Sequence, residues 1–111
     1  PVILHSCGYY GEVIDEVIDD LKLDGRHSYE DKITPVEQAY EELHGRIAVL
    51  GGIDVDFMCR HTPAEVNERA KRMLERTAGR GGYALGSGNS IPEYVPDEAY
   101  IAMIRAALDA G

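Results

Sequence analysis

The chain has 111 residues, 44% of them hydrophobic, and its formal net charge is −9 at pH 7. This length and composition predict one packed domain over residues 1–111. The acidic excess argues against a nucleic-acid partner, which would need a basic surface. No apolar run approaches the ~20 residues of a membrane span, so we expect no membrane partner. The two cysteines, Cys7 and Cys59, do not form a disulfide framework, and we expect a cytoplasmic location.

The sequence opens on the apolar run 2–4, which leads into His5, Ser6, Cys7 and Gly8. A run of this kind before a glycine and a helical pattern is typical of a buried parallel strand that enters a βα turn. His5 and Cys7 share a strand face because they are two residues apart, and both residue types bind zinc. The alternative is a core thiol beside a hydrogen-bonded histidine. Since no lead-in precedes the strand, we also expect a longer parent protein.

Strand and helix patterns then alternate along the sequence. In two places a threonine precedes a proline, and a glutamate follows three residues after the threonine, which predicts capping boxes at Thr34/Glu37 and Thr62/Glu65. The predicted order begins with a strand that His5, Ser6 and Cys7 end, a helix with an apolar stripe from Val13 to Leu21, and a weak strand over 26–29. A helix from Thr34 to Gly45, a strand over 47–50 and a helix from Thr62 to Gly79 follow. The last two elements are a strand over 82–85 and a helix from Pro96 with Tyr100, Ile101, Ile104 and Leu108 packed inward.

This alternation predicts a parallel sheet with right-handed crossovers. The sheet could be four consecutive units of an eightfold barrel, or a small open doubly wound sheet. Polar residues follow every predicted strand, at His5, His27, Asp54 and Asn89, as they do around a barrel mouth, whereas an open sheet usually concentrates them at one switch point. We therefore expect an α/β fold of four parallel β/α units, half of a TIM (β/α)8 barrel.

Three further features are candidates for chemistry. Glu30 and Asp54 each follow a strand and could form an acid–base pair or bind a metal, although carboxylates are also common in such loops. The segment 86–90 (Gly-Ser-Gly-Asn-Ser) could cradle a phosphate or form a plain tight turn, because it lacks the order of a dinucleotide-binding loop. Cys59 lies beside Phe57 and Met58 and is expected to pack rather than react.

Taken together, three motifs resemble the uroporphyrinogen decarboxylase superfamily. They are His-Ser-Cys-Gly at 5–8, Gly-Gly-Ile-Asp at 51–54, and the strand and loop over 79–90 that continue into Ile-Pro-Glu-Tyr-Val-Pro at 91–96. The resemblance covers essentially the whole sequence and implies the C-terminal half of that family's barrel, with the N-terminal half missing. The superfamily contains cofactor-free decarboxylases of uroporphyrinogen and corrinoid-linked methyltransferases that use zinc to activate a thiol such as coenzyme M.

The resemblance also implies roles for individual residues. The His5-x-Cys7 pair resembles the methyltransferase branch, so both residues are expected zinc ligands. Asn89 stands where the decarboxylases place a functional histidine and the methyltransferases a third zinc ligand, a cysteine. Glu30 is then an expected ligand or base, and Asp54 and Asn89 are expected to line the catalytic pocket.

We therefore interpret the chain as the C-terminal part of an enzyme that performs zinc-dependent, corrinoid-linked methyl transfer to a thiol. The alternatives are a tetrapyrrole decarboxylase and a folding or assembly unit without activity. The expected cofactor is zinc, and the expected small-molecule partner is a tetrapyrrole or corrinoid-linked substrate. The chain alone is expected to be inactive and to pair either with itself, as a homo-oligomer, or with the missing N-terminal half.

Overall fold

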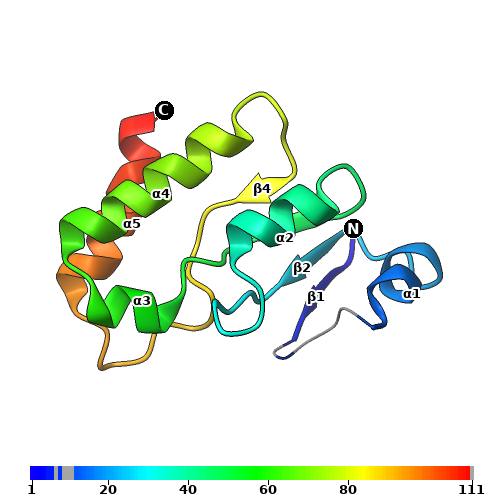
Figure 1. The fold of residues 1–111 in the computed structure, drawn as a ribbon, viewed down its shortest axis with the longest axis horizontal. Helices are drawn as coiled ribbons and strands as arrows, with labels where there is room; N and C mark the ends of the chain where they lie inside the picture. The colour runs from blue at the N-terminus through cyan, green and yellow to red at the C-terminus, as the bar shows by residue number, and fades with distance from the viewer. Residues whose placement is uncertain (7, 9–11, 111) are drawn as a thin grey trace.

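A parallel sheet organises the fold in the computed structural model, which describes residues 1–6, 8 and 12–110. Its elements are β1 (Ile3–His5), α1 (Ile14–Asp19), β2 (Gly25–His27), α2 (Val36–Leu43), β3 (Ala48–Leu50), α3 (Val55–Arg60), α4 (Pro63–Thr77), β4 (Tyr83–Ala84) and α5 (Asp97–Ala110). In Figure 1, α2 lies over the strands, and α4 and α5 lie side by side at the far end of the molecule from α1.

The strands are arranged in the order in which they occur in the sequence. Within the described residues the sheet order is β1-β2-β3-β4, and every neighbouring pair is parallel. In an open doubly wound sheet the spatial order of the strands reverses at a switch point. In a (β/α)8 barrel each strand lies beside the next one in the sequence. The consecutive order therefore confirms the predicted fold class, four parallel β/α units that form half of a barrel.

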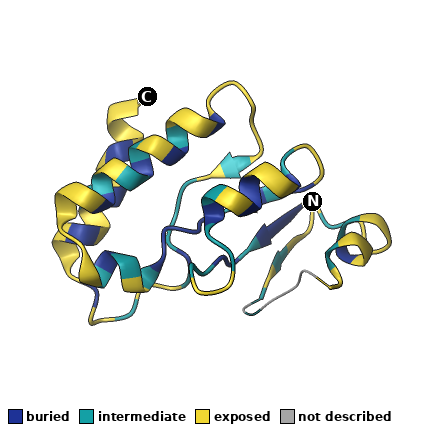
Figure 2. Ribbon diagram, in the orientation of Figure 1, coloured by how far each residue is buried: buried dark blue, intermediate teal, exposed yellow. Residues whose placement is uncertain are grey.

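The two faces of this sheet have different surroundings. Val49 points to the helix-covered face and is completely buried, together with the apolar side of α2. The opposite face, which corresponds to the barrel interior, carries the side chains of Ile3 and His5, and both are exposed. In Figure 2, β1 is largely exposed while β2 is mostly buried. Helix α1 is also shallowly packed, since Val17 is its one buried residue among the positions described.

Two groups of buried side chains hold the described part of the chain together. The first joins the sheet to α2 and the second joins α3, α4 and α5. The first contains Tyr29, Val36, Ala39, Tyr40, Leu43, Ile47, Val49 and Met73. The second contains Ile53, Met58, Val66, Ala70, Val95, Ala99, Met103 and Ala106. Within the described range, no helix combines the length and the apolar character needed to cross a membrane.

The structure corrects the predicted buried face of the last helix. Tyr100, Ile101, Ile104 and Leu108 were expected to pack inward, but between 38% and 74% of each residue is exposed. The buried residues of α5 are instead Ala99, Met103 and Ala106. Small side chains on this face allow α5 to approach α4 closely, and Ala70 of α4 is itself completely buried.

One of the two predicted capping boxes is present in the structure. The capping box at Thr62 and Glu65 is present at the start of α4. The box predicted at Thr34 and Glu37 is wrong, because the Glu37 carboxylate binds Arg69 and the Thr34 N–H donates to the Glu30 carbonyl. Helix α3 was not predicted at all.

Candidate functional site

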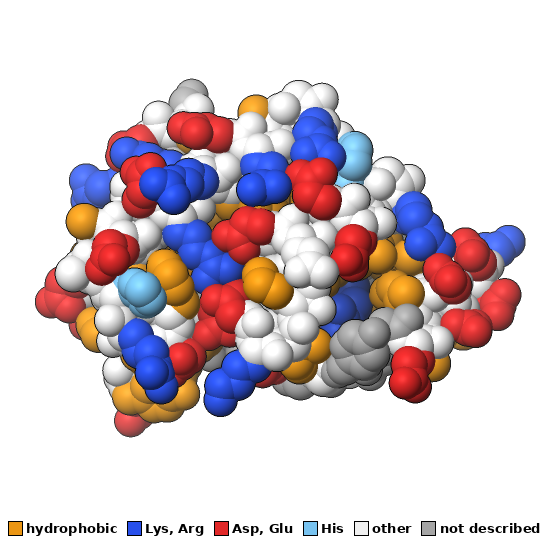
Figure 3. All heavy atoms as spheres, viewed as in Figure 1, with side chains coloured by type: hydrophobic (Ala, Val, Ile, Leu, Met, Phe, Trp, Pro, Cys, Tyr) orange, Lys and Arg blue, Asp and Glu red, His pale blue; other side chains and the backbone are white. Residues whose placement is uncertain are grey.

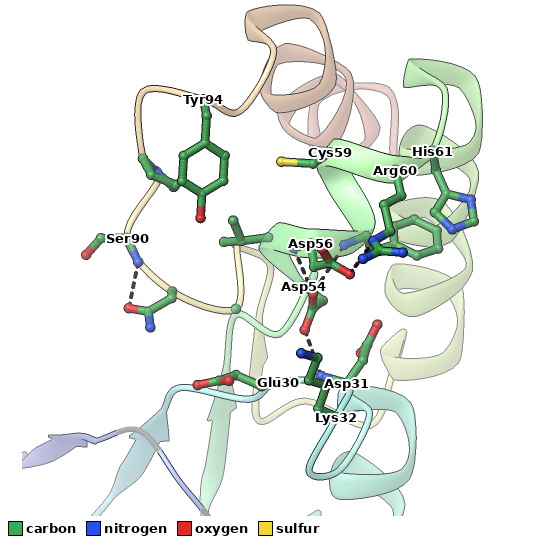
Figure 4. A pocket seen from close by; sticks show the side chains of 15 residues that line it. Glu30, Asp31, Lys32, Asp54, Asp56, Cys59, Arg60, His61, Ser90 and Tyr94 are labelled. Carbon is green, nitrogen blue, oxygen red and sulfur yellow. Dashed lines mark hydrogen bonds and ion pairs between the residues drawn. The ribbon is translucent and has the colours of Figure 1, made fainter.

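A cleft of about 740 Å³ lies beside the segments that follow β2, β3 and β4 (Figure 4). The predicted catalytic residues Glu30, Asp54 and Asn89 all line it, although they come from three different loops. Parallel strands bring their carboxyl ends to the same edge of a sheet, and this explains the convergence. The cleft is also lined by Asp31, Lys32, Val55, Asp56, Phe57, Cys59, Arg60, His61, Gly88, Ser90, Pro92 and Tyr94.

Asp54 is the most constrained carboxylate of the cleft. Its Oδ1 accepts hydrogen bonds from the N–H groups of Asp56 and Phe57 at 2.8 and 3.2 Å, and so caps α3. Its Oδ2 accepts from the Asp31 N–H at 2.7 Å. Since the residue is 8% exposed and both oxygens are occupied, Asp54 holds α3 and the loop after β2 in place.

A partly buried arginine supports that loop from the other side. Arg69 of α4 forms ion pairs with Asp31 at 2.7 Å and with Glu37 at 2.9 Å, and its guanidinium lies over the Phe57 ring. Burial alone would raise the pKa of Glu37, but the hydrogen bonds and charge of Arg69 outweigh it and hold that pKa below its ordinary value. The wall of the cleft is therefore fixed by a charged network that reaches from α4 to Asp54.

Glu30 differs from these carboxylates. No hydrogen bond or ion pair joins its side chain to another residue in the described part of the chain, and Figure 4 shows it apart from the Asp31–Asp54 contact. On the opposite side, the Cys59 thiol and the Tyr94 hydroxyl point into the space between α3 and the loop after β4. The Glu30 carboxylate is thus available for a ligand, whereas Asp54 is not.

The predicted metal ligand His5 lies outside this cleft, at the end of β1. Its Nδ1 is 2.7 Å from Nδ1 of His27, its register partner on β2, and the two rings stack with centroids 4.9 Å apart. Nε2 of His27 is in turn 3.0 Å from the Ser87 carbonyl oxygen, just before the cleft residues Gly88 and Asn89. The other predicted ligand, Cys7, lies outside the described residues.

Sequence reasoning did not assign a role to His27. The signal was present, because a histidine ends each of the first two strands, but the pairing depends on sheet register. A glycine keeps room for the contact. Gly51 has φ +80°, and a Cβ there would approach the Ser87 carbonyl oxygen and come within 2.7 Å of the His27 ring.

The family match decides what kind of protein this is. The family model described as uroporphyrinogen decarboxylase (URO-D) matches residues 1–109. The chain belongs to the uroporphyrinogen decarboxylase family. Among solved structures it is similar to a methyltransferase from Methanosarcina mazei, with 25% sequence identity and a TM-score of 0.71. The match covers 97% of this chain and 31% of the methyltransferase, so this uroporphyrinogen decarboxylase family chain spans less than a third of that protein. No curated protein matches it.

A zinc ion in a protein is bound mainly by histidine, cysteine and carboxylate side chains. Among the described residues, no group of three or more His, Cys, Asp and Glu side chains is placed to hold a metal. His5 nevertheless contributes an imidazole whose Nε2 has no hydrogen bond to a described residue, and a thiol follows two positions later in the sequence. Imidazole and thiolate are both ordinary zinc ligands, so the chemistry of these donors fits zinc with two protein ligands.

The loop 86–90 behaves as a tight turn. The Gly88 N–H donates to the Ile53 carbonyl at 2.7 Å, and the Ser90 N–H donates to the Asn89 side chain at 2.8 Å. A Cβ at Gly88 would collide with the Tyr29 carbonyl oxygen. The N–H groups of Gly88 and Ser90 are thus already used within the fold, and this favours the plain-turn interpretation over a phosphate site.

Proposed function

We propose that the chain is the C-terminal part of a zinc-dependent enzyme that transfers a methyl group from a corrinoid to a thiol. The observation that carries this proposal is the placement of His5 at the end of β1, two residues before Cys7 and connected through His27 to the loop that leads into the cleft. The similarity to a protein named as a methyltransferase supports the same reaction class. Because the chain spans only part of that protein, the complete activity belongs to the parent enzyme.

His5 and Cys7 would hold the zinc ion, which when bound lowers the pKa of a substrate thiol and stabilises the thiolate. Two protein ligands would leave two tetrahedral positions for solvent and substrate, one more than a catalytic zinc site with three protein ligands leaves open. Glu30 is the one cleft carboxylate among Glu30, Asp31, Asp54 and Asp56 without a hydrogen bond or ion pair to another described residue. We assign to Glu30 the acceptance of the proton that leaves the thiol.

Asn89 and Asp54 have different tasks in this proposal. Asn89 lines the cleft from the loop after β4 and offers an amide for orientation of the substrate, without acid–base chemistry. Asp54 keeps the opposite wall in shape through its three N–H contacts. Neither residue would change its protonation state during the reaction.

The test uses the full-length enzyme, with methylcobalamin as methyl donor and coenzyme M as acceptor. We expect about one zinc ion per chain and thiol methylation that a chelator abolishes. Both should be lost in Cys7→Ala and His5→Ala and retained in His44→Ala, a histidine at the end of α2 that stacks on Tyr40. Zinc-free protein that decarboxylates uroporphyrinogen would overturn the proposal in favour of the decarboxylase alternative.

A further inference from the structure

The contacts of His27 with Ser87 and with His5 limit which ring nitrogens can donate and which can accept a hydrogen bond. Nε2 of His27 is 3.0 Å from the Ser87 carbonyl oxygen, which can only accept a hydrogen bond. His27 must therefore carry a proton on Nε2. In a neutral imidazole the other nitrogen is then unprotonated, so Nδ1 of His27 is an acceptor.

The same reasoning extends to His5. Its Nδ1 lies 2.7 Å from Nδ1 of His27, a hydrogen-bond distance at which one of the two nitrogens must donate. Since Nδ1 of neutral His27 accepts, Nδ1 of His5 carries the proton. The lone pair of His5 is consequently on Nε2, on the exposed inner face of the sheet.

We propose that His27 is a positioning residue that fixes the tautomer and ring orientation of His5, so that Nε2 of His5 is the nitrogen offered to a ligand. The part of this inference that concerns zinc rests on the proposed function, whereas the tautomer does not. A partner that accepts the second N–H of a metal-binding histidine orients the ring and strengthens binding. Here that partner would be a second histidine, held in turn by a backbone carbonyl.

The geometry does not support His27 as a zinc ligand alongside Nδ1 of His5. Two nitrogens bound to one tetrahedral zinc ion at ~2.0–2.1 Å lie about 3.3 Å apart, further than the observed 2.7 Å. Nε2 of His27 is already engaged by Ser87. The register of β1 and β2 also makes the two histidines direct partners, which suits a hydrogen bond between rings that stack at 4.9 Å.

The proposal can be tested in the full-length enzyme without metal and without turnover. At pH 8, side-chain nitrogen-15 spectra of histidine-labelled protein report which ring nitrogen of a neutral imidazole carries the proton. The His5 signals are assigned by their loss in His5→Gln. We expect His5 to be protonated on Nδ1 in the wild type, and this preference to be lost in His27→Leu. A wild-type His5 protonated on Nε2, or an unchanged preference in His27→Leu, would overturn the proposal.

A zinc titration separates positioning from a merely structural role. His27→Leu should weaken zinc binding by ~10–100-fold, the usual effect of removing such a partner. His27→Asn keeps an acceptor oxygen near the position of Nδ1 and should recover most of that loss. Equal weakening in both variants would contradict the proposal. If the wild type binds no zinc, the proposed function fails, and the nitrogen-15 spectra still decide whether His27 sets the tautomer of His5.

Discussion

The Arg69 guanidinium binds both oxygens of the Asp31 carboxylate, with Nη1 to Oδ2 at 2.7 Å and Nη2 to Oδ1 at 2.8 Å. The same group binds Glu37 through two further contacts of 2.9 Å. Figure 3 shows basic and acidic side chains interleaved on the face that α2 and α4 share. The Asp31 N–H also donates a hydrogen bond to Asp54. The pair of Arg69 and Asp31 therefore links helices α2 and α4 to the wall of the cleft.

Arg69→Met should therefore lower the free energy of unfolding by about 2–4 kcal/mol, because it leaves two partly buried carboxylates without a partner. The matched control is Arg72→Met on the same helix, where Arg72 is 75% exposed and pairs with Glu68 at 3.2 Å. That change should cost less than ~0.5 kcal/mol. Urea unfolding of both variants is the measurement, and similar losses in the two would show that the network contributes little.

Acid should weaken the fold through two glutamates of α2. Burial acts to raise the pKa of Glu37, but Arg69 outweighs it and the pKa lies below 4.5. The hydrogen bond from Arg80 is the main cause that lowers the pKa of Glu41 to about 2. The pKa of each glutamate is therefore lower in the folded than in the unfolded protein. The stabilisation that their ion pairs contribute is present above about pH 4.5 and is lost as the pH falls toward 2.

The measurement is the difference in unfolding free energy between pH 7 and pH 3. We expect Glu41→Gln to reduce this difference, because the variant cannot lose the ion pairs with Arg76 and Arg80 on acidification. Glu98→Gln at the start of α5 is the control, since no ion pair joins Glu98 to another described residue. An identical acid loss in Glu41→Gln and the wild type would exclude this contribution.

Asp54→Asn should destabilise the protein by about 1–3 kcal/mol, because the amide keeps one acceptor oxygen but turns its NH2 group toward N–H donors on the other side. Both carboxylate oxygens of Asp54 accept backbone N–H groups, from Asp56 and Phe57 at one oxygen and from Asp31 at the other, so either orientation of the amide loses an acceptor. Asp56→Asn is the control, since Asp56 is more than half exposed and pairs only with Arg60 among the described residues. We expect thermal denaturation to shift in Asp54→Asn and hardly at all in Asp56→Asn. If Asp54→Asn abolished activity with unchanged stability, Asp54 would have a chemical role.

Gly51→Ala tests how closely the backbone at Gly51 approaches the His27 ring and the Ser87 carbonyl group. The new Cβ would meet the Ser87 carbonyl and the His27 ring, in addition to the strain of φ +80°. We expect the free energy of unfolding to fall by about 2–4 kcal/mol and the side-chain nitrogen-15 signals of the histidines to change. Gly79→Ala has a similar φ of +76° and open space around the new atom, so it isolates the backbone cost of about 1–2 kcal/mol. Equal losses in the two variants would mean that the neighbours of Gly51 give way freely.

The uncovered inner face should make residues 1–111 associate when produced alone. Ile3 on this face is 55% exposed and Val2, which precedes the strand, is 58% exposed. The edge of β1 that faces away from β2 has no partner strand among the described residues. Exposed strand edges and apolar faces attract partners. Sedimentation velocity should show dimers or larger species, and Ile3→Lys should shift them toward monomer. A wild-type monomer at high micromolar concentration would contradict this expectation.

Local patterns in the sequence were sufficient for much of the fold. The run 47–50 gave β3, and the Thr62–Glu65 capping box gave the start of α4, because both signals lie within a few residues. The clustering of Glu30, Asp54 and Asn89 followed from the strand order alone. The role of His27 could not be predicted in this way, because its partner lies 22 residues away and only sheet register joins them. The buried face of α5 likewise depends on how closely α4 approaches it.

The shallow packing of β1 and α1 implies a gradient of local opening along the chain. β1 has two exposed residues and one of intermediate burial, and α1 buries Val17 alone, whereas α4 buries four side chains along its length. Backbone amides in thinly packed elements exchange with solvent through small openings that leave the rest of the fold intact. Amides of β1 should thus exchange before those of β3 and α4. A ligand that captures His5 would slow exchange first in β1 and leave the walls of the cleft almost unaffected.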